Sequence, residues 1–148
     1  MKGDVVPDSD HVSRLCGGSH IDNGVIKATA FLLNPGDTYL SVNWLELLGL
    51  PDRASQIAEI QRVMATKRTV GTRARLAVAA VGDMRTVVQN QSEDHRVLKV
   101  LHEPEDDPLK PDPSHSGIHD LRHDDLMIAI LLARVFAEVH FARASGLS

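Results

Sequence analysis

An apolar run near the C-terminus, LMIAILLARVFAEVHFA at residues 126–142, constrains the fold more than any other feature. Drawn as a helix, it is apolar around much of its circumference, and only Arg134, Glu138 and His140 interrupt it. Such a helix must be covered on several sides by the rest of the chain. We expect it to begin after Asp124 or Asp125, to run to about residue 144 and to end at Gly146. It is too short and too charged to cross a bilayer.

Two segments in the first third of the chain predict β-structure. HVSRLC at 11–16 alternates as a short strand, with Val12 and Arg14 on one face. The β-favouring runs 25–33 and 38–44 flank Asn-Pro-Gly-Asp, a pattern typical of a β-hairpin.

The middle of the chain predicts helices followed by strands. Asn43 can cap a short helix, WLELLG, and Pro51 suits the first turn of a longer helix to about Lys67. The core-facing stripe of that longer helix would be Ile57, Ile60, Val63 and Met64. Residues 75–84 are apolar at nearly every position, as in a strand covered on both faces or a buried helix. Thr-Val-Val at 86–88 favours the strand, continued after a turn at Gly82 and Asp83. A last strand would span 96–104.

This order of elements predicts an α+β fold. We expect a mixed or mainly antiparallel sheet with an N-terminal hairpin, two middle helices and a buried C-terminal helix packed on the sheet. A length of 148 residues predicts a single domain. Residues 1–10 are expected to be loosely ordered. Residues 103–113 hold four prolines and five acidic residues and are expected to form a surface loop.

Charge and cysteine content narrow the classes of function. A net charge of −4 argues against a general nucleic-acid binder, although Lys67, Arg68, Arg73 and Arg75 form a basic strip or a solvated turn. One cysteine, Cys16, permits no intramolecular disulfide. With no apolar segment near Met1 to act as a signal, we expect a soluble cytoplasmic protein.

Histidine is abundant, with eight in the chain, and three recur every four residues in DPSHSGIHDLRHDD. On a helix, His115, His119 and His123 would share one face and could bind a divalent metal with an aspartate. On a strand, histidines four residues apart stand about 13 Å from each other, too far to share one ion. The metal hypothesis therefore requires a helix over residues 114–123.

Individual residues suggest other chemistry. His115, between Ser114 and Ser116, suits acid/base catalysis or hydrogen bonding to a ligand, or it is a surface histidine near an aspartate. Arg14, with His11 nearby, suits an anion clamp, or it pairs with Asp8, Asp10 or Asp22.

Two further segments have both a functional and a structural interpretation. Tyr39, Ser41 and Asn43 can form the floor of a site for a flat ligand, or Ser41 faces solvent and Asn43 caps a helix. Cys16 is a nucleophile if a neighbouring His or Arg stabilises its thiolate, and otherwise a small core residue.

Arg14 with His11 on a first strand, Tyr39 with Ser41 on a second, and His115 on a later one resemble the ADP-ribosyltransferase-like superfamily, which includes RES-domain toxins and RNA 2'-phosphotransferases. The resemblance implies that the first group holds NAD, that the second lies near the nicotinamide, and that His115 supplies the polar group of the later strand.

Three functions remain open. The sequence favours a non-catalytic interaction or accessory module of a bacterial multi-protein system, which binds a protein partner or a second copy through its apolar helix. This is because each chemical motif also has an ordinary structural explanation. The alternatives are a nucleotide- or NAD-using enzyme, with Arg14 as anion clamp and His115 as acid/base, and a metal-dependent hydrolase. The enzyme would be favoured if one pocket held at least three of His11, Arg14, Ser41, His102 and His115.

Overall fold

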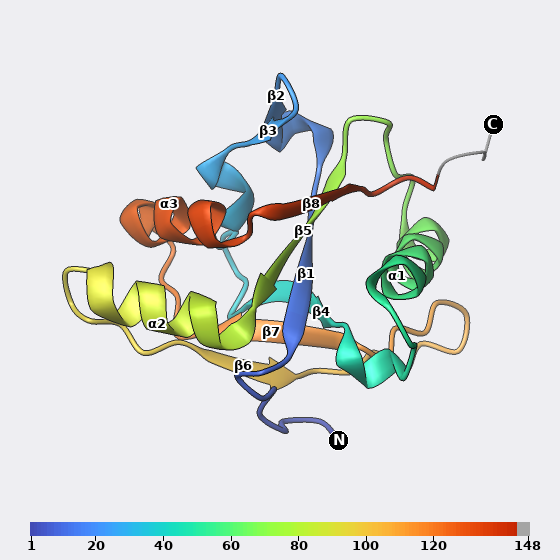
Figure 1. Ribbon diagram of the computed structural model, residues 1–148, viewed down its shortest axis with the longest axis horizontal. Coiled ribbons are helices and arrows are strands. Elements are labelled where there is room, and N and C mark those ends of the chain that lie inside the picture. Colours follow the sequence, from blue (N-terminus) through green and yellow to red (C-terminus); the bar gives the residue numbers. More distant parts are fainter. Residues whose placement is uncertain (145–148) are drawn as a thin grey trace.

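A computed structural model describes residues 1–144 as an α+β fold built on a six-stranded antiparallel sheet (Figure 1). The strand order across the sheet is β6-β7-β4-β1-β5-β8. In chain order these strands are β1 (His11–Cys16), β4 (Leu40–Trp44), β5 (Arg75–Ala80), β6 (Lys99–His102), β7 (His115–His119) and β8 (Glu138–Phe141). A separate two-stranded ribbon joins β2 (Ile21–Asp22) to β3 (Val25–Ile26).

Helices cover both faces of the sheet. The α-helices are α1 (Arg53–Lys67), α2 (Val81–Gln91) and α3 (Leu126–Val135). Short 3-10 turns occupy η1 (Gly18–His20), η2 (Ala28–Phe31) and η3 (Glu46–Leu48). Figure 1 shows α1 on one side of the sheet and α2 and α3 together on the other.

Two apolar clusters hold these layers together. The first packs α2 and α3 against one face of the sheet and includes Met84, Val88 and Leu132. The second packs α1 against the other face, and all four residues of the predicted stripe, Ile57, Ile60, Val63 and Met64, belong to it. The predicted α+β class and the core-facing stripe of α1 are therefore confirmed.

The sheet is split at its centre. β1 pairs with β5 over six residue pairs but with β4 over only two, Val12 with Trp44 and Ser13 with Asn43. Beyond Ser13 the two strands separate, and Figure 1 shows β1 and β5 running steeply across β4 and β7. Main-chain polar groups at this divergence need partners other than a neighbouring strand.

The predicted N-terminal hairpin is wrong. Residues 28–31 form the turn η2 rather than a strand, and β4 pairs with β1 and β7 instead of with residues 25–33. The physical reason is that η2 buries Ala30 and Phe31, and the Phe31 ring packs against Phe136 with ring centroids 5.0 Å apart. A helical turn presents both side chains to that cluster.

Two other boundaries differ from expectation. Residues 81–91 form α2, so Gly82 and Asp83 lie in a helix and 86–88 do not continue the strand. Helix α3 ends at Val135, and residues 138–141 become the edge strand β8. The expected end at Gly146 lies outside the described residues.

The N-terminal segment is held against the sheet rather than loosely ordered. Val5 bridges to Leu101, the Val6 amide donates to the Val100 carbonyl at 2.9 Å, and Val6 is buried. In the described part of the chain, no helix combines the length and the apolar character that a membrane crossing requires.

Candidate functional site

A cavity of about 310 Å³ opens where β1 and β4 diverge. Its wall includes β1, β4, the C-terminal end of α1, the start of β7 and the acidic loop. Three of the five residues singled out from the sequence line it, namely Arg14, Ser41 and His115. Two other predicted ligand-binding residues, Tyr39 and Asn43, line it as well. β4 lies between β1 and β7 in the sheet, which is why residues from distant parts of the chain meet here.

Arg14 lies at the point where the strand ladder ends. Its Nε donates to the Ala30 carbonyl at 3.0 Å and its Nη1 donates to the Ser41 carbonyl at 2.7 Å. The Arg14 side chain thus provides a hydrogen-bond donor for the Ser41 carbonyl, a main-chain acceptor on β4 that is not paired with β1. Burial, above all, lowers the pKa of Arg14 from its usual value.

The Arg14 guanidinium has spare hydrogen-bonding capacity. It carries five N–H donors, and its hydrogen bonds to the two carbonyls use two of them. It forms no ion pair with any carboxylate of residues 1–144. The alternative that Arg14 pairs with Asp8, Asp10 or Asp22 is therefore wrong; Asp8 pairs with Arg85 and Asp10 accepts from the Trp44 indole.

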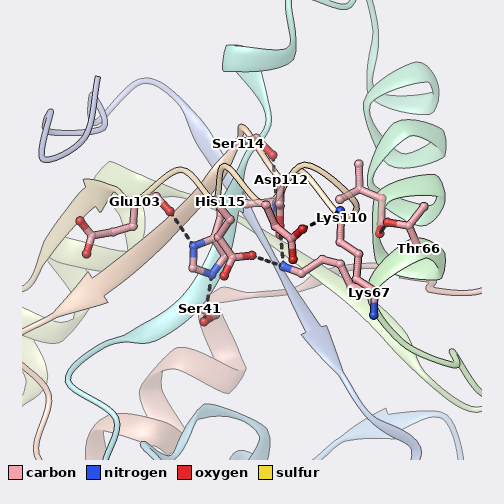
Figure 2. Close-up of polar contacts among 12 residues, drawn as sticks. Ser41, Thr66, Lys67, Glu103, Lys110, Asp112, Ser114 and His115 are labelled. Carbon is pink, nitrogen blue, oxygen red and sulfur yellow. Dashed lines mark hydrogen bonds and ion pairs between the residues drawn. The ribbon is translucent and has the colours of Figure 1, made fainter.

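His115 is buried at the cavity floor, where both ring nitrogens have partners (Figure 2). Nδ1 lies 2.8 Å from the Glu103 carbonyl oxygen, and Nε2 lies 3.2 Å from Ser41 Oγ. A carbonyl oxygen only accepts hydrogen bonds, so Nδ1 carries the proton and Nε2 of the neutral ring accepts one from Ser41. The ring is therefore fixed in one tautomer with its lone pair directed at the Ser41 hydroxyl.

A partly buried ion-pair network forms the wall beside His115. Lys67 Nζ donates to Asp112 Oδ2 at 2.9 Å and to Glu105 Oε1 at 2.5 Å. The Asp112 side chain is fully buried, and its other oxygen accepts from Asn43 Nδ2 at 2.8 Å. Asn43 also donates to Ser114 Oγ at 2.9 Å. Figure 2 shows Lys67, Asp112 and Ser114 of this network beside His115 and its contacts.

Tyr39 forms another wall of the cavity, and its position depends on Gly117. A Cβ at Gly117 would lie 2.3 Å from Tyr39 Cδ1, so only glycine leaves room for the ring on β7. The Tyr39 ring packs between His115, in edge contact with centroids 5.9 Å apart, and His119, tilted at 5.0 Å. Burial is the largest of several causes that raise the pKa of Tyr39.

Three predicted site residues lie elsewhere. His11, predicted as catalytic, does not line the cavity; its Nδ1 pairs with Glu46 Oε2 at 2.7 Å. Ser116, predicted to bind ligand, is on the opposite face of β7 from His115, fully buried, and donates to the Ser114 carbonyl. Ser114, also fully buried, holds Asn43 rather than lining the cavity.

The metal hypothesis is wrong because residues 115–119 form a strand. His115 and His119 therefore share a face but are too far apart along it for one ion. Within residues 1–144, no three His, Cys, Asp or Glu side chains are grouped to bind a metal. His123 lies exposed in the loop before α3.

Cys16 has the character of a core residue. The side chain is 1% exposed, and burial raises the pKa of its thiol to about 11. A thiol of this kind is a poor nucleophile at neutral pH. Its Sγ contacts the Arg14 carbonyl at 3.6 Å.

Sequence reasoning missed several residues of the site. Lys67 and Arg68, interpreted as part of a basic strip, line the cavity, whereas Arg73 and Arg75 donate to nearby main-chain carbonyls. Glu105 belongs to a loop expected to be solvated. The signal available for Lys67 was its position in the last turn of an amphipathic helix; nothing in the sequence pairs it with the loop.

Comparisons of the chain with protein-family models, with curated proteins and with solved structures find no match. The geometry of the cavity is therefore the basis for inferring a function.

Proposed function

We propose that this protein is an enzyme that acts on an anionic ligand of nucleotide type. Arg14 would hold a phosphate of the ligand, and His115 would act as general acid or base. The observation that carries the proposal is the convergence of Arg14, Ser41 and His115 on one cavity. These residues lie on three different strands, and none of them belongs to the apolar clusters that form the core.

The unpaired guanidinium groups of the cavity support an anionic ligand. Arg14, Lys67 and Arg68 contribute cationic groups, and Asp37 and Glu105 contribute carboxylates. Lys67 is already paired with Glu105 and with Asp112. Arg14 and Arg68 have no carboxylate partner among the described residues. A guanidinium with free N–H donors in a partly dry site binds phosphate oxygens through a planar fork, which lysine cannot reproduce.

The tautomer of His115 supports a role in proton transfer. A general base needs a lone pair within hydrogen-bond reach of the proton that it takes, and Nε2 meets that condition for the Ser41 hydroxyl. The carbonyl of Glu103 holds the ring from behind, as the orienting group of a catalytic histidine does.

NAD is the first ligand to test. Five residues carry the resemblance to ADP-ribosyltransferases. Four of them, Arg14, Tyr39, Ser41 and His115, line this cavity, and His11 does not. The flat Tyr39 ring suits an aromatic base or nicotinamide next to the phosphate contacts.

Calorimetric titration with NAD, ADP and ATP at low salt tests the proposal. We expect at least one of them to bind, and Arg14→Ala to weaken binding by about 10- to 150-fold, the equivalent of one charged hydrogen-bonding group. Arg134→Ala, at an exposed position on α3, is the matched control and should bind as the wild type does. Because Arg14 also holds two carbonyls, Arg68→Ala serves as a second variant with no such structural role. If none of NAD, ADP and ATP binds, the proposal is refuted.

An interaction module remains the second candidate, because α3 begins with exposed apolar residues. Leu126 is 51% and Met127 is 71% exposed, in a helix that is otherwise largely buried. Light scattering at several concentrations, compared with a Met127→Glu variant, tests self-association through this turn. A monomer at all concentrations that also retains no partner in pull-down experiments would exclude it.

A further inference from the structure

We propose that Ser41 is a nucleophile that attacks the phosphorus of a phosphate ester, with His115 as its general base. The inference rests on the proposed function, because it assumes that the same cavity takes a phosphate-bearing ligand. It goes further because it assigns a covalent intermediate, and therefore a reaction class, to the site. Binding of the ligand alone would not require an activated serine.

Ser41 is placed as a nucleophile must be. Its side chain is exposed and lines the cavity, so an incoming ligand can reach Oγ. Its Oγ–H donates to the unprotonated Nε2 of His115. A serine hydroxyl becomes a competent nucleophile when an adjacent base takes its proton, and this pairing is the required signature.

The strand register of the sheet places Ser41 next to His115. Ser41 lies opposite Gly117 on the neighbouring strand, and His115 is two residues from Gly117 on the same face. His115 is 5% exposed, and its Nδ1 is bound to the Glu103 carbonyl, so the ring has no freedom to swing away. This carbonyl takes the orienting role that a carboxylate has in other serine–histidine arrangements.

The surrounding charge favours phosphorus over an acyl carbon as the electrophile. Attack on phosphorus spreads negative charge over several oxygens, and catalysis depends mainly on cations placed around them. Arg14 is bound to the carbonyl of Ser41 itself, and Arg68, which pairs with no carboxylate of residues 1–144, lines the same cavity. An acyl-transfer site instead uses two preorganised N–H donors for a single oxyanion.

The reaction balances with water as the only co-reactant. Ser41 Oγ bonds to phosphorus while the bond from phosphorus to the leaving oxygen breaks. The hydroxyl proton moves to His115 Nε2 and then to the leaving oxygen. In the second half, water attacks phosphorus and gives its proton to His115, and the bond from phosphorus to Ser41 breaks as Oγ takes that proton back.

Two probes test the inference on the full chain. Diisopropyl fluorophosphate should add one phosphoryl group per molecule, located on the peptide that contains Ser41 by mass spectrometry. Thymidine 5'-(4-nitrophenyl phosphate) should release nitrophenolate. Both signals should disappear in Ser41→Ala, which removes the hydroxyl but leaves the carbonyl that holds Arg14. Ser19→Ala, at an exposed serine outside the cavity, should behave as the wild type.

His115→Gln should slow the labelling of Ser41 by about 100-fold or more, the usual contribution of a general base. If this buried substitution prevents folding, Ser41→Ala still decides the question. Wild-type protein that binds nucleotides but gains no adduct, or an adduct that persists in Ser41→Ala, would overturn the inference and leave the proposed function intact. An adduct on Ser41 in a protein that binds no nucleotide would support the nucleophile and refute the nucleotide proposal.

Discussion

Replacing Lys67 with methionine should destabilise the protein strongly, because it removes the counter-ion of a buried carboxylate. Lys67 Nζ is the only cation bound to the Asp112 carboxylate among the described residues, and the Asp112 side chain is 0% exposed. Methionine keeps most of the apolar stem of lysine and removes the charge. The variant therefore leaves a buried carboxylate without its counter-ion while changing little of the packing.

The expected cost follows from these contacts. Breaking a buried ion pair by removing one partner costs about 3–5 kcal/mol, because the remaining charge stays desolvated. Asp112 retains one hydrogen bond from Asn43, which places the cost at the lower end of that range. The second partner of Lys67, Glu105, has a 42% exposed side chain, and so adds less than about 1 kcal/mol. We expect a loss of about 3 kcal/mol, equivalent to about 6–12 °C in Tm for a chain of this size.

Urea unfolding followed by tryptophan fluorescence measures this loss, with Arg68→Met as the matched control. Arg68 is the next residue, is exposed and forms no ion pair among the described residues, so its replacement should change stability by less than about 0.5 kcal/mol. Combining Lys67→Met with Asp112→Asn should restore much of the stability, because no unpaired charge remains. A free energy of unfolding for Lys67→Met within about 1 kcal/mol of the value for Arg68→Met would refute this prediction, because breaking a buried ion pair should cost about 3–5 kcal/mol.

Gly117→Ala should cost about 1–3 kcal/mol and change the near-ultraviolet signal of the single tyrosine, because the new Cβ would lie 2.3 Å from Tyr39 Cδ1; an unchanged melting curve would contradict it. Cys16, with its pKa raised by burial from 9.0 to about 11, should react with iodoacetamide at pH 8 at least about 100-fold more slowly in the folded than in the unfolded protein. Burial raises the pKa of Glu105, but its hydrogen bond from Lys67 and nearby positive charges outweigh this and hold the pKa below 4.5. Its stabilisation is therefore present above pH 4.5 and lost as pH falls through the lower pKa. The destabilisation by Glu105→Gln, a few tenths of a kcal/mol at about pH 6 in urea titrations, should shrink progressively as pH falls below 4.5.

Local patterns predicted those elements that depend on local contacts. Helix α1 followed from the spacing of Ile57, Ile60, Val63 and Met64, because a 3.6-residue period buries one face wherever the helix packs. The strand β1 followed from its alternation. In both cases the residues inside the element carry enough information to define it.

Long-range pairing is what the sequence could not provide. The runs 25–33 and 38–44 have high β-propensity and a turn between them, but the partners of β4 are β1 and β7, far away in the chain. Two errors had local signals that were outweighed. Val81, Met84 and Val88 follow a helical spacing, and Glu138 to Phe141 alternate polar and apolar residues as an edge strand does.

Part of the candidate site was predictable, and the missing part explains how it is held. Arg14, Ser41 and His115 were suggested by residue type, and the sheet order brings them together. Glu103, whose carbonyl orients His115, belongs to the acidic loop at 103–113, which the sequence predicted to be only a surface loop. Two charged side chains of this loop, Glu105 and Asp112, bind Lys67 on α1, and no pattern within either segment predicts that contact.

The acidic loop therefore links stability to the chemistry of the site. Lys67 anchors Asp112 and Glu105, and these two residues bond to each other through both main-chain amides. The closed loop that results presents the Glu103 carbonyl to His115, and this contact selects the tautomer that faces Ser41. A variant that loosens the loop should thus reduce the reactivity of Ser41 even though it touches neither Ser41 nor His115. Without urea and well below its Tm, where the fold persists, Lys67→Met should label more slowly than Arg134→Ala, a control outside the cavity. Equal labelling rates would mean that the loop stabilises the fold without orienting the histidine.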